Sequence, residues 1–199
     1  MPISRKARFP RFAAVAGVAI GLPWAAILAT PAAAQLVPHR AVYNLELDVA
    51  RSSADVSAIN GRIVFEFVGS TCEGYTQNMR YVMQITNRDG LTNLSDLRTS
   101  TWEDAEGKRF RFNQSSFDND QPSSMVSGNA QRLEGSGTID VKVEQPAELS
   151  LNLPQGALFP VQHTIAILAA AKQQKNIFSV NLYDGSDKGD KMLFANAAI

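Results

Sequence analysis

Most of the chain after residue 37 alternates apolar and polar side chains with a period of two, and this pattern limits the possible folds more than any other feature. Successive side chains of a β-strand point to opposite faces, so such alternation is typical of strands with one buried face. Residues 95–102 are rich in Thr and Ser and suit a strand with one solvent-exposed face. Residues 149–153 predict a further short strand. The sequence therefore predicts a mainly β protein. The alternating segments are 37–49, 62–68, 75–86, 109–113, 137–143 and 177–183.

Turn-forming residues separate these segments. Asn60-Gly61 predicts a turn that joins the first two strands into a hairpin. Residues 103–108 and 184–190 also predict turns, because Gly, Asp and Ser tolerate the required backbone angles. Residues 115–129 are dominated by Ser, Asn, Asp and Gln, so we expect a loop there.

The pattern changes at residues 153–160. Pro160 suits the first turn of a helix, where its missing N–H is not needed. Val161, Ile165 and Leu168 follow at helical spacing and predict an amphipathic helix from Val161 to about Gln174. Because the sequence has no internal repeat and no linker, we expect one domain over residues 35–199, built from one sheet and one helix.

The N-terminus has the order of parts of a signal peptide. Four basic residues precede an apolar stretch at 12–29, and Ala32-Ala33-Ala34 supplies the small residues that a signal peptidase reads. We predict cleavage between Ala34 and Gln35, so that residues 1–34 are a signal peptide and the mature protein is periplasmic. The basic residues are Arg5, Lys6, Arg8 and Arg11.

Two other roles for this segment are disfavoured. A retained membrane anchor is disfavoured because Pro23 interrupts the stretch, which is short against the about 20 residues that span a bilayer. A lipid anchor is disfavoured because Gln35 follows the small residues and no cysteine is nearby. No later apolar run could span a bilayer, so we expect a soluble mature chain.

The charge of the mature chain bears on its partners. Removing four of the 19 basic residues leaves 15 against 19 acidic residues, a charge near −4. Binding to nucleic acid or to an anionic membrane then loses its electrostatic driving force. The remaining 165 residues can bury a core. The chain stops directly after a strand-like segment, so we expect it to be incomplete at its C-terminus.

Cys72 is the single cysteine of a chain that we predict to enter an oxidising compartment. An unpaired thiol there indicates an intermolecular bridge, a reactive site or a missing partner. We favour the missing partner. No Cys-x-x-Cys motif indicates thiol oxidoreductase chemistry.

Residues that could support catalysis or metal binding are sparse. His39 and His163 are the two histidines, and we interpret both as structural or capping residues, because no nucleophile motif accompanies them. Asp184, Asp187 and Asp190 lie three residues apart, unlike the alternate ligands of a calcium loop, and favour a turn. We therefore predict no catalytic residue, no metal site and no cofactor.

Glu103, Asp104 and Glu106 form a carboxylate cluster beside Trp102. Such a group could recognise a sugar or supply the acid and base of a glycosidase. We favour a solvated turn, because the cluster lies where Gly107 must reverse the chain.

Several longer motifs resemble the cell envelope integrity protein EipB family, once catalogued as a domain of unknown function. They lie at 37–43, 72–76, 96–104, 110–112 and 153–160 with His163, and the 183–189 turn extends the match over essentially the whole mature chain. The residues that carry the resemblance are His39, Arg40, Tyr75, Arg98, Trp102, Glu103, Asp104, Phe110, Phe112, Pro160 and His163.

This resemblance implies a periplasmic protein with a long, strongly curved antiparallel sheet, a spiral or broken barrel with a helix packed against it. The architecture is similar to that of lipoprotein carriers and receptors in outer-membrane sorting. The family carries a disulfide whose first cysteine matches Cys72. The second cysteine would then lie beyond Ile199, as expected for a C-terminally truncated member.

Three hypotheses for function follow. We favour a non-enzymatic protein that supports envelope integrity and binds an apolar or peptide ligand, a lipoprotein or another envelope protein in its concave face. The alternative is an enzyme acting on cell-wall glycan through Glu103, Asp104 or Glu106. A third possibility is an interaction module whose open sheet edge pairs with a partner strand.

Overall fold

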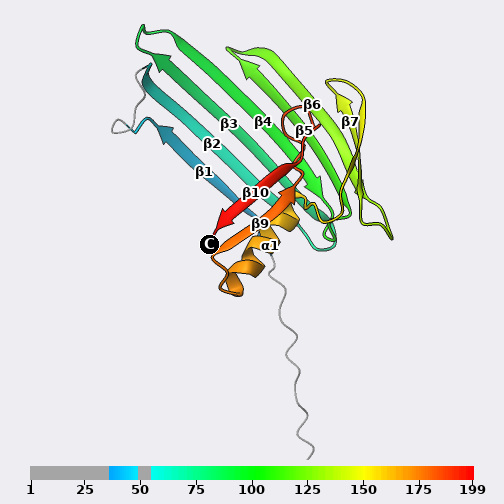
Figure 1. Ribbon diagram of the computed structural model, residues 1–199. Coiled ribbons are helices and arrows are strands. Elements are labelled where there is room, and N and C mark those ends of the chain that lie inside the picture. The colour runs from blue at the N-terminus through cyan, green and yellow to red at the C-terminus, as the bar shows by residue number, and fades with distance from the viewer. Residues whose placement is uncertain (1–35, 49–54) are drawn as a thin grey trace, which may run out of the picture. The chain divides into compact units, whose positions relative to one another are not determined.

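Eight strands form a single antiparallel sheet in which the spatial order is the order along the chain (Figure 1). The computed structural model describes residues 36–48 and 55–199, and these described residues belong to one compact unit. The sheet is not closed, because β1 and β8 are each paired on one side within the described residues. The strands are β1 His39–Glu46, β2 Val56–Ser70, β3 Gly74–Asn87, β4 Thr92–Glu103, β5 Arg109–Asp118, β6 Gln121–Arg132, β7 Ile139–Gln145 and β8 Leu149–Leu153.

After β8 the chain forms the helix α1, Pro160–Lys172, and a hairpin of β9, Ile177–Leu182, and β10, Leu193–Ala198. The mainly β fold, an unclosed antiparallel sheet with one helix among the described residues, is confirmed. The expectation of one sheet is wrong, because β9 and β10 pair only with each other. An isolated bridge between Leu158 and Leu182 links the hairpin to the segment before α1.

Pro160 occupies the start of α1, as predicted, and the helix ends at Lys172, two residues before the predicted end. The N-terminal boundary follows from Phe159, whose backbone is extended and has no side-chain cap. A proline at this position loses no hydrogen bond, and its fixed φ angle favours the helix.

The structure places two sequence-predicted elements differently. Asn60-Gly61 is no turn, because both residues lie inside β2, where Gly61 pairs with Leu45 on one side and Met83 on the other. A methyl group on Gly61 would lie 2.8 Å from the carbonyl oxygen of Val82, so the glycine permits close packing of strands.

The predicted loop at residues 115–129 is also wrong. Those residues form the second half of β5 and most of β6, joined by a tight turn at Asn119 and Asp120, which both have positive φ angles. Backbone hydrogen bonds between strands do not depend on side-chain polarity. A hairpin with polar side chains can therefore form where the neighbouring strands provide hydrogen-bond partners for its backbone.

The strand register assigns each side chain to one of two faces, since paired residues of antiparallel strands point to the same side. The inner face, against which α1 packs, carries Phe67, Tyr75 and Glu103. The outer face carries the residues between them, including Arg98 and Trp102.

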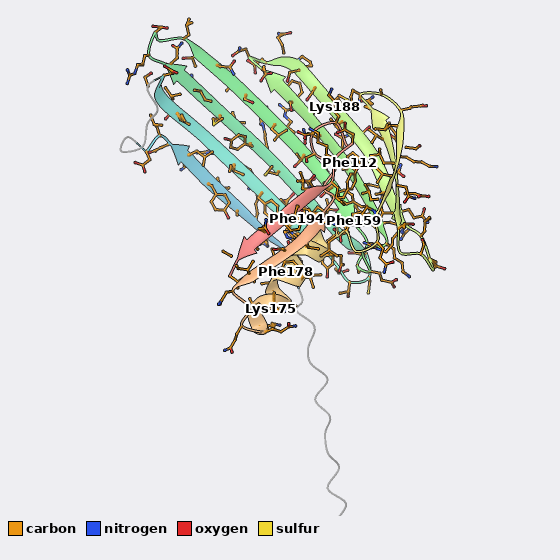
Figure 2. All side chains as sticks on the ribbon, in the orientation of Figure 1. Phe112, Phe159, Lys175, Phe178, Lys188 and Phe194 are labelled. Carbon is orange, nitrogen blue, oxygen red and sulfur yellow. The ribbon has the colours of Figure 1, made fainter. Side chains whose placement is uncertain are left out.

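The main core lies on the inner face of β5 to β8. In Figure 2, Phe112 and Phe159 lie where the elements after β8 meet the sheet. Phe110 stacks on Phe159 with 5.0 Å between ring centroids, and the edge of Tyr183 contacts both Phe110 and Phe112. The buried residues of this cluster are Phe110, Phe112, Val126, Ala130, Ile139, Val141, Val143, Leu153, Ala157, Phe159 and Tyr183.

Two observations concern membranes and export. Within residues 36–48 and 55–199, α1 is too short and not apolar enough to cross a bilayer. The predicted cleavage site at Ala34 and Gln35 lies outside the described residues.

Candidate functional site

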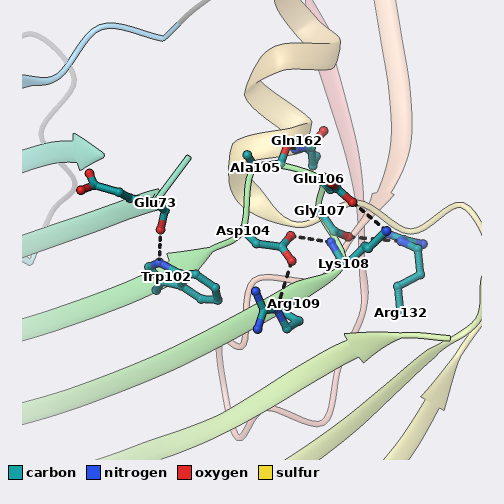
Figure 3. Close-up of polar contacts among 10 residues, drawn as sticks. All are labelled: Glu73, Trp102, Asp104, Ala105, Glu106, Gly107, Lys108, Arg109, Arg132 and Gln162. Carbon is teal, nitrogen blue, oxygen red and sulfur yellow. Dashed lines mark hydrogen bonds and ion pairs between the residues drawn. The ribbon is translucent and has the colours of Figure 1, made fainter. Parts of the chain in front are cut away.

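Many of the sequence-predicted residues gather at one end of the sheet, where the β2–β3 and β4–β5 turns lie close to the start of α1 (Figure 3). Trp102 donates a hydrogen bond from Nε1 to the carbonyl of Glu73 at 3.2 Å, which ties β4 to the β2–β3 turn. Gln162 of α1 donates from Nε2 to the carbonyl of Ala105 at 3.1 Å. The two turns and the helix therefore form one connected structure.

Asp104 organises the β4–β5 turn. Its Oδ1 accepts the backbone N–H of Lys108 at 2.7 Å, and its Oδ2 accepts Nε–H of Arg109 at 3.2 Å. Glu106 forms an exposed ion pair with Lys108 at 2.7 Å. Two of the three clustered carboxylates thus stabilise the turn, but only Glu106 is solvated, since the side chain of Asp104 is 15% exposed.

Glu103 differs from its two neighbours. Its side chain is 1% exposed and accepts the first N–H groups of α1, from Val161 at 2.7 Å and Gln162 at 3.0 Å. Burial raises the pKa of Glu103 to about 7, against the opposing effect of these two N–H donors. The expected solvated position is therefore wrong for Glu103, which caps the helix from the sheet.

An open hollow of about 480 Å³ lies beside the turns. Acidic and basic side chains both line it, among them Asp104, Arg109 and Arg132. Cys72 lies at its rim in the β2–β3 turn, exposed and with a free thiol. The hollow therefore has mixed charge and holds no group of three metal-ligating side chains among the described residues.

The aromatic residues of the N-terminal motif lie on the inner face. His39 contacts the rings of Phe65 and Phe67 at centroid distances of 5.7 and 5.8 Å, and Phe67 stacks on Tyr75 at 5.3 Å. The Nδ1 atom of His39 lies 2.8 Å from the carbonyl of Val37. His39 therefore lies among the aromatic rings of the inner face, and its structural role stays a prediction.

A second hollow, of about 420 Å³, lies on the inner face between the sheet and α1. Phe65, Met79 and Leu182 supply apolar surface, and Thr99 and His163 supply polar groups. The Nε2 atom of His163 is buried and has no hydrogen-bond partner in the described part of the chain. Sequence reasoning missed Met79 and Thr99 as site residues, although Met79 belongs to the alternating segment 75–86.

Beyond this hollow the inner face continues as an apolar surface, which we call the open end. The register aligns Ile63 with Tyr81 and Tyr81 with Leu97 across β2, β3 and β4. Met83 and Ile85 extend the same row of β3. All five are half-buried, and in Figure 1 α1 and the β9–β10 hairpin cross the opposite end of the sheet.

The metal and catalytic hypotheses find no further support in the geometry. Asp184 accepts the N–H of Ser186, and Asp187 pairs with Lys191 at 3.0 Å, so both act within the β9–β10 turn. Gly185 of the same turn has a positive φ angle, and a methyl group at this position would collide with the ring of Phe112.

Comparison with known proteins identifies the family. The model of the EipB-like family matches residues 30–199. The cell envelope integrity protein EipB of Brucella abortus (strain 2308) is 36% identical over 195 residues, which cover 96% of this chain and 69% of the relative.

A solved structure agrees with this match. The crystal structure of a β-barrel-like protein of a domain of unknown function from Brucella abortus superposes with a TM-score of 0.74 at 36% identity. The superposition covers 81% of this chain and 67% of that protein.

Proposed function

Because this chain belongs to the EipB-like family, we propose that it supports the integrity of the bacterial cell envelope from the periplasm. The relative from Brucella abortus carries that role in its name. The signal-peptide pattern of residues 1–34 supports export to the same compartment.

The open end carries the second part of the proposal, that the protein acts by binding an apolar or peptide partner. Its residues come from strands whose outer faces are mostly polar, so the alternation encodes an apolar surface there. Contiguous apolar surface that the rest of a protein leaves open is typical of a binding site. The half-buried residues Ile63, Tyr81, Met83, Ile85 and Leu97 would contact the ligand.

A neutral apolar dye, N-phenylnaphthylamine, tests this binding directly. We expect its fluorescence to rise with the wild-type protein and to fall severalfold with Met83→Glu, because a charge in the open end makes apolar burial unfavourable. Gln84→Glu is the matched control, since Gln84 is the next residue of β3 and is exposed on the outer face.

The same variants connect binding to function. In a strain depleted of the native protein, we expect Gln84→Glu to restore growth in detergent and Met83→Glu to fail, at equal protein levels and with thermal unfolding measured for both. Absence of dye binding by the wild type, or full rescue by Met83→Glu, would show that the open end is not the working surface.

Intact mass tests the proposals for processing and for Cys72. For protein recovered from the periplasm, we expect loss of residues 1–34. A change of mass or mobility on reduction would indicate a bridge to Cys72, and a free thiol would contradict the proposed disulfide.

The glycan-active alternative is less favoured by the geometry. Glu103 is buried and both of its carboxylate oxygens accept N–H groups of α1. Asp104 has both oxygens engaged in the turn. A general acid must reach the bond that it protonates, and neither of these carboxylates has that access in this arrangement. Glu106, the third residue of the cluster, is exposed but forms an ion pair with Lys108 at 2.7 Å.

A further inference from the structure

Six arginines share the outer face of β1 to β5, and we call this surface the arginine face. The register places them there, since Arg40 pairs with Glu66, Arg80 pairs with Arg98, and Trp102 pairs with Arg111. Every one of the six is exposed to solvent. They are Arg40, Arg62, Arg80, Arg98, Arg109 and Arg111.

Asp96 orients two of these arginines. Arg80 binds it through Nε at 3.0 Å and Nη2 at 2.8 Å, and Arg98 through Nε at 3.2 Å and Nη2 at 2.7 Å. Hydrogen bonds from Arg80 and then Arg98 lower the pKa of Asp96 to about 2. Asp96 itself is 7% exposed, so the guanidinium groups, each with further N–H donors, cover its charge.

Aromatic rings hold three of the arginines over the sheet. The guanidinium of Arg111 lies 4.4 Å from the centre of the Trp102 ring, and that of Arg109 lies 5.4 Å from it. Arg98 lies 4.7 Å from the ring of Phe117. Cation–π contacts of this kind fix the positions of the charges without neutralising them.

The charges on this surface are arranged unequally. Within β1 to β5, three carboxylates share this face with the six arginines, which gives it a net charge of +3 on a chain that would be near −4 after cleavage. Of these, Glu46 is exposed, Glu66 is half-buried and Asp96 is buried. The turns at one end of the face add three carboxylates and one lysine, namely Glu73, Asp104, Glu106 and Lys108. The overall negative charge disfavours binding of the whole chain to anionic membranes. The arginine face nevertheless has a local positive charge and presents its guanidinium groups to solvent.

Shallow hollows lie between these arginines. One, of about 410 Å³, is lined by Arg40, Arg80 and Arg98 together with Asn78 and the half-buried carboxylate of Glu66. Another, of about 330 Å³, is lined by Arg109, Arg111 and Trp102. Guanidinium groups with free N–H donors bind phosphate oxygens, often through two parallel hydrogen bonds.

We propose that the arginine face docks the protein on an anionic phospholipid surface, each arginine cluster contacting lipid phosphates. The charge is spread over five strands, which suits a surface of many phosphates better than a single acidic segment. Trp102 and the exposed side chains of Val42, Val68 and Met125 add the apolar and aromatic contacts found at membrane interfaces. This proposal concerns the opposite face from the open end and does not depend on ligand binding there.

Vesicle sedimentation tests the docking. We compare vesicles of phosphatidylglycerol and phosphatidylethanolamine with vesicles of phosphatidylcholine. The protein is the processed form recovered from cells, and its mass is measured to establish that residues 1–34 are absent. We expect binding to the anionic vesicles that weakens as salt is added. Each arginine removed should weaken it about fivefold, so Arg40→Gln with Arg111→Gln should weaken it about 25-fold.

Lys175→Gln with Lys188→Gln is the matched control. Both lysines are exposed and lie beyond β8, in the part of the chain that follows the sheet (Figure 2). Their double substitution removes the same total charge as the double arginine substitution. Dye binding at the open end should be unchanged in both pairs of variants, which separates this test from the one above.

Selective loss of vesicle binding in the arginine pair supports the proposal. Equal weakening in both pairs would overturn it, because only the net charge would then matter. Absence of binding to anionic vesicles would overturn it, as would binding of inorganic phosphate or of an acidic protein by the same arginines without any vesicle binding.

Discussion

The two ends of the inner face use the same sequence pattern and reach different structures. At the packed end, Phe110 and Phe112 are almost fully buried beneath Phe159 and Tyr183. At the open end, Tyr81 and its neighbours alternate just as regularly but remain half-buried. Alternation therefore assigns a side chain to a face, whereas elements that arrive from distant parts of the chain decide whether that face is covered.

The largest expected difference between the two ends is in core energetics. Phe110→Ala should lower the free energy of unfolding by about 3–5 kcal/mol, since it leaves a cavity that surrounding residues cannot fill. Tyr81→Ala should lower it by about 1 kcal/mol, because that side chain is only half-buried. Urea denaturation of both variants measures the contrast, and equal losses would show that the open end is packed in solution.

The free energy of unfolding should depend on pH through Glu103, which is buried at the packed end. Its pKa is raised from the ordinary 4.5 to about 7, so the folded chain holds the proton more tightly than the unfolded chain. Stability from this group is therefore fully present below pH 4.5 and is lost as the pH rises through about 7, by about 3 kcal/mol at most.

Glu103→Gln supplies the control for that titration. Glutamine does not ionise, so the difference in unfolding free energy between wild type and variant should change with pH between 4.5 and 7. The titration of other groups cancels in this difference. A difference that is constant over this range would mean that Glu103 keeps an ordinary pKa.

A smaller effect should distinguish the turns at the two ends. Gly74 and Gly90 have nearly equal φ angles, +79° and +80°, yet a methyl group on Gly74 would lie 2.6 Å from the carbonyl oxygen of Glu103, whereas one on Gly90 would meet nothing within 4 Å. We expect Gly74→Ala to lower stability by about 2–4 kcal/mol and Gly90→Ala by about 1 kcal/mol. Melting temperatures measure both, and equal shifts would indicate that the packed turn can relax.

Sequence predicted what depends on neighbouring residues and missed what depends on distant ones. The alternation of Arg109 to Asn113 and the proline before α1 were sufficient to predict β5 and the helix start. The polar residues after Ser115 hid the continuation of β5, because only pairing with β4 and β6 shows it. Gly61 resembled a turn for the same reason, since its close contact with Val82 exists only in the folded sheet.

The candidate site shows the same limit. The cluster of Glu103, Asp104 and Glu106 was visible in the sequence, but their separate roles were not. Glu103 follows the inner-face residue Thr101 by two positions, so alternation could have placed it inward. Its partners Val161 and Gln162, 58 and 59 residues away, could not have been identified from sequence spacing.

The sequential strand order also shapes how the molecule is built. Each strand from β2 to β8 pairs with the strand made just before it, so the sheet can grow hairpin by hairpin as the chain emerges, with short loops to close at each step. The helix must wait, because its cap on β4 joins residues that are far apart in the chain. We therefore expect assembly to begin at the N-terminal strands, with an apolar sheet face exposed to its surroundings until α1 arrives.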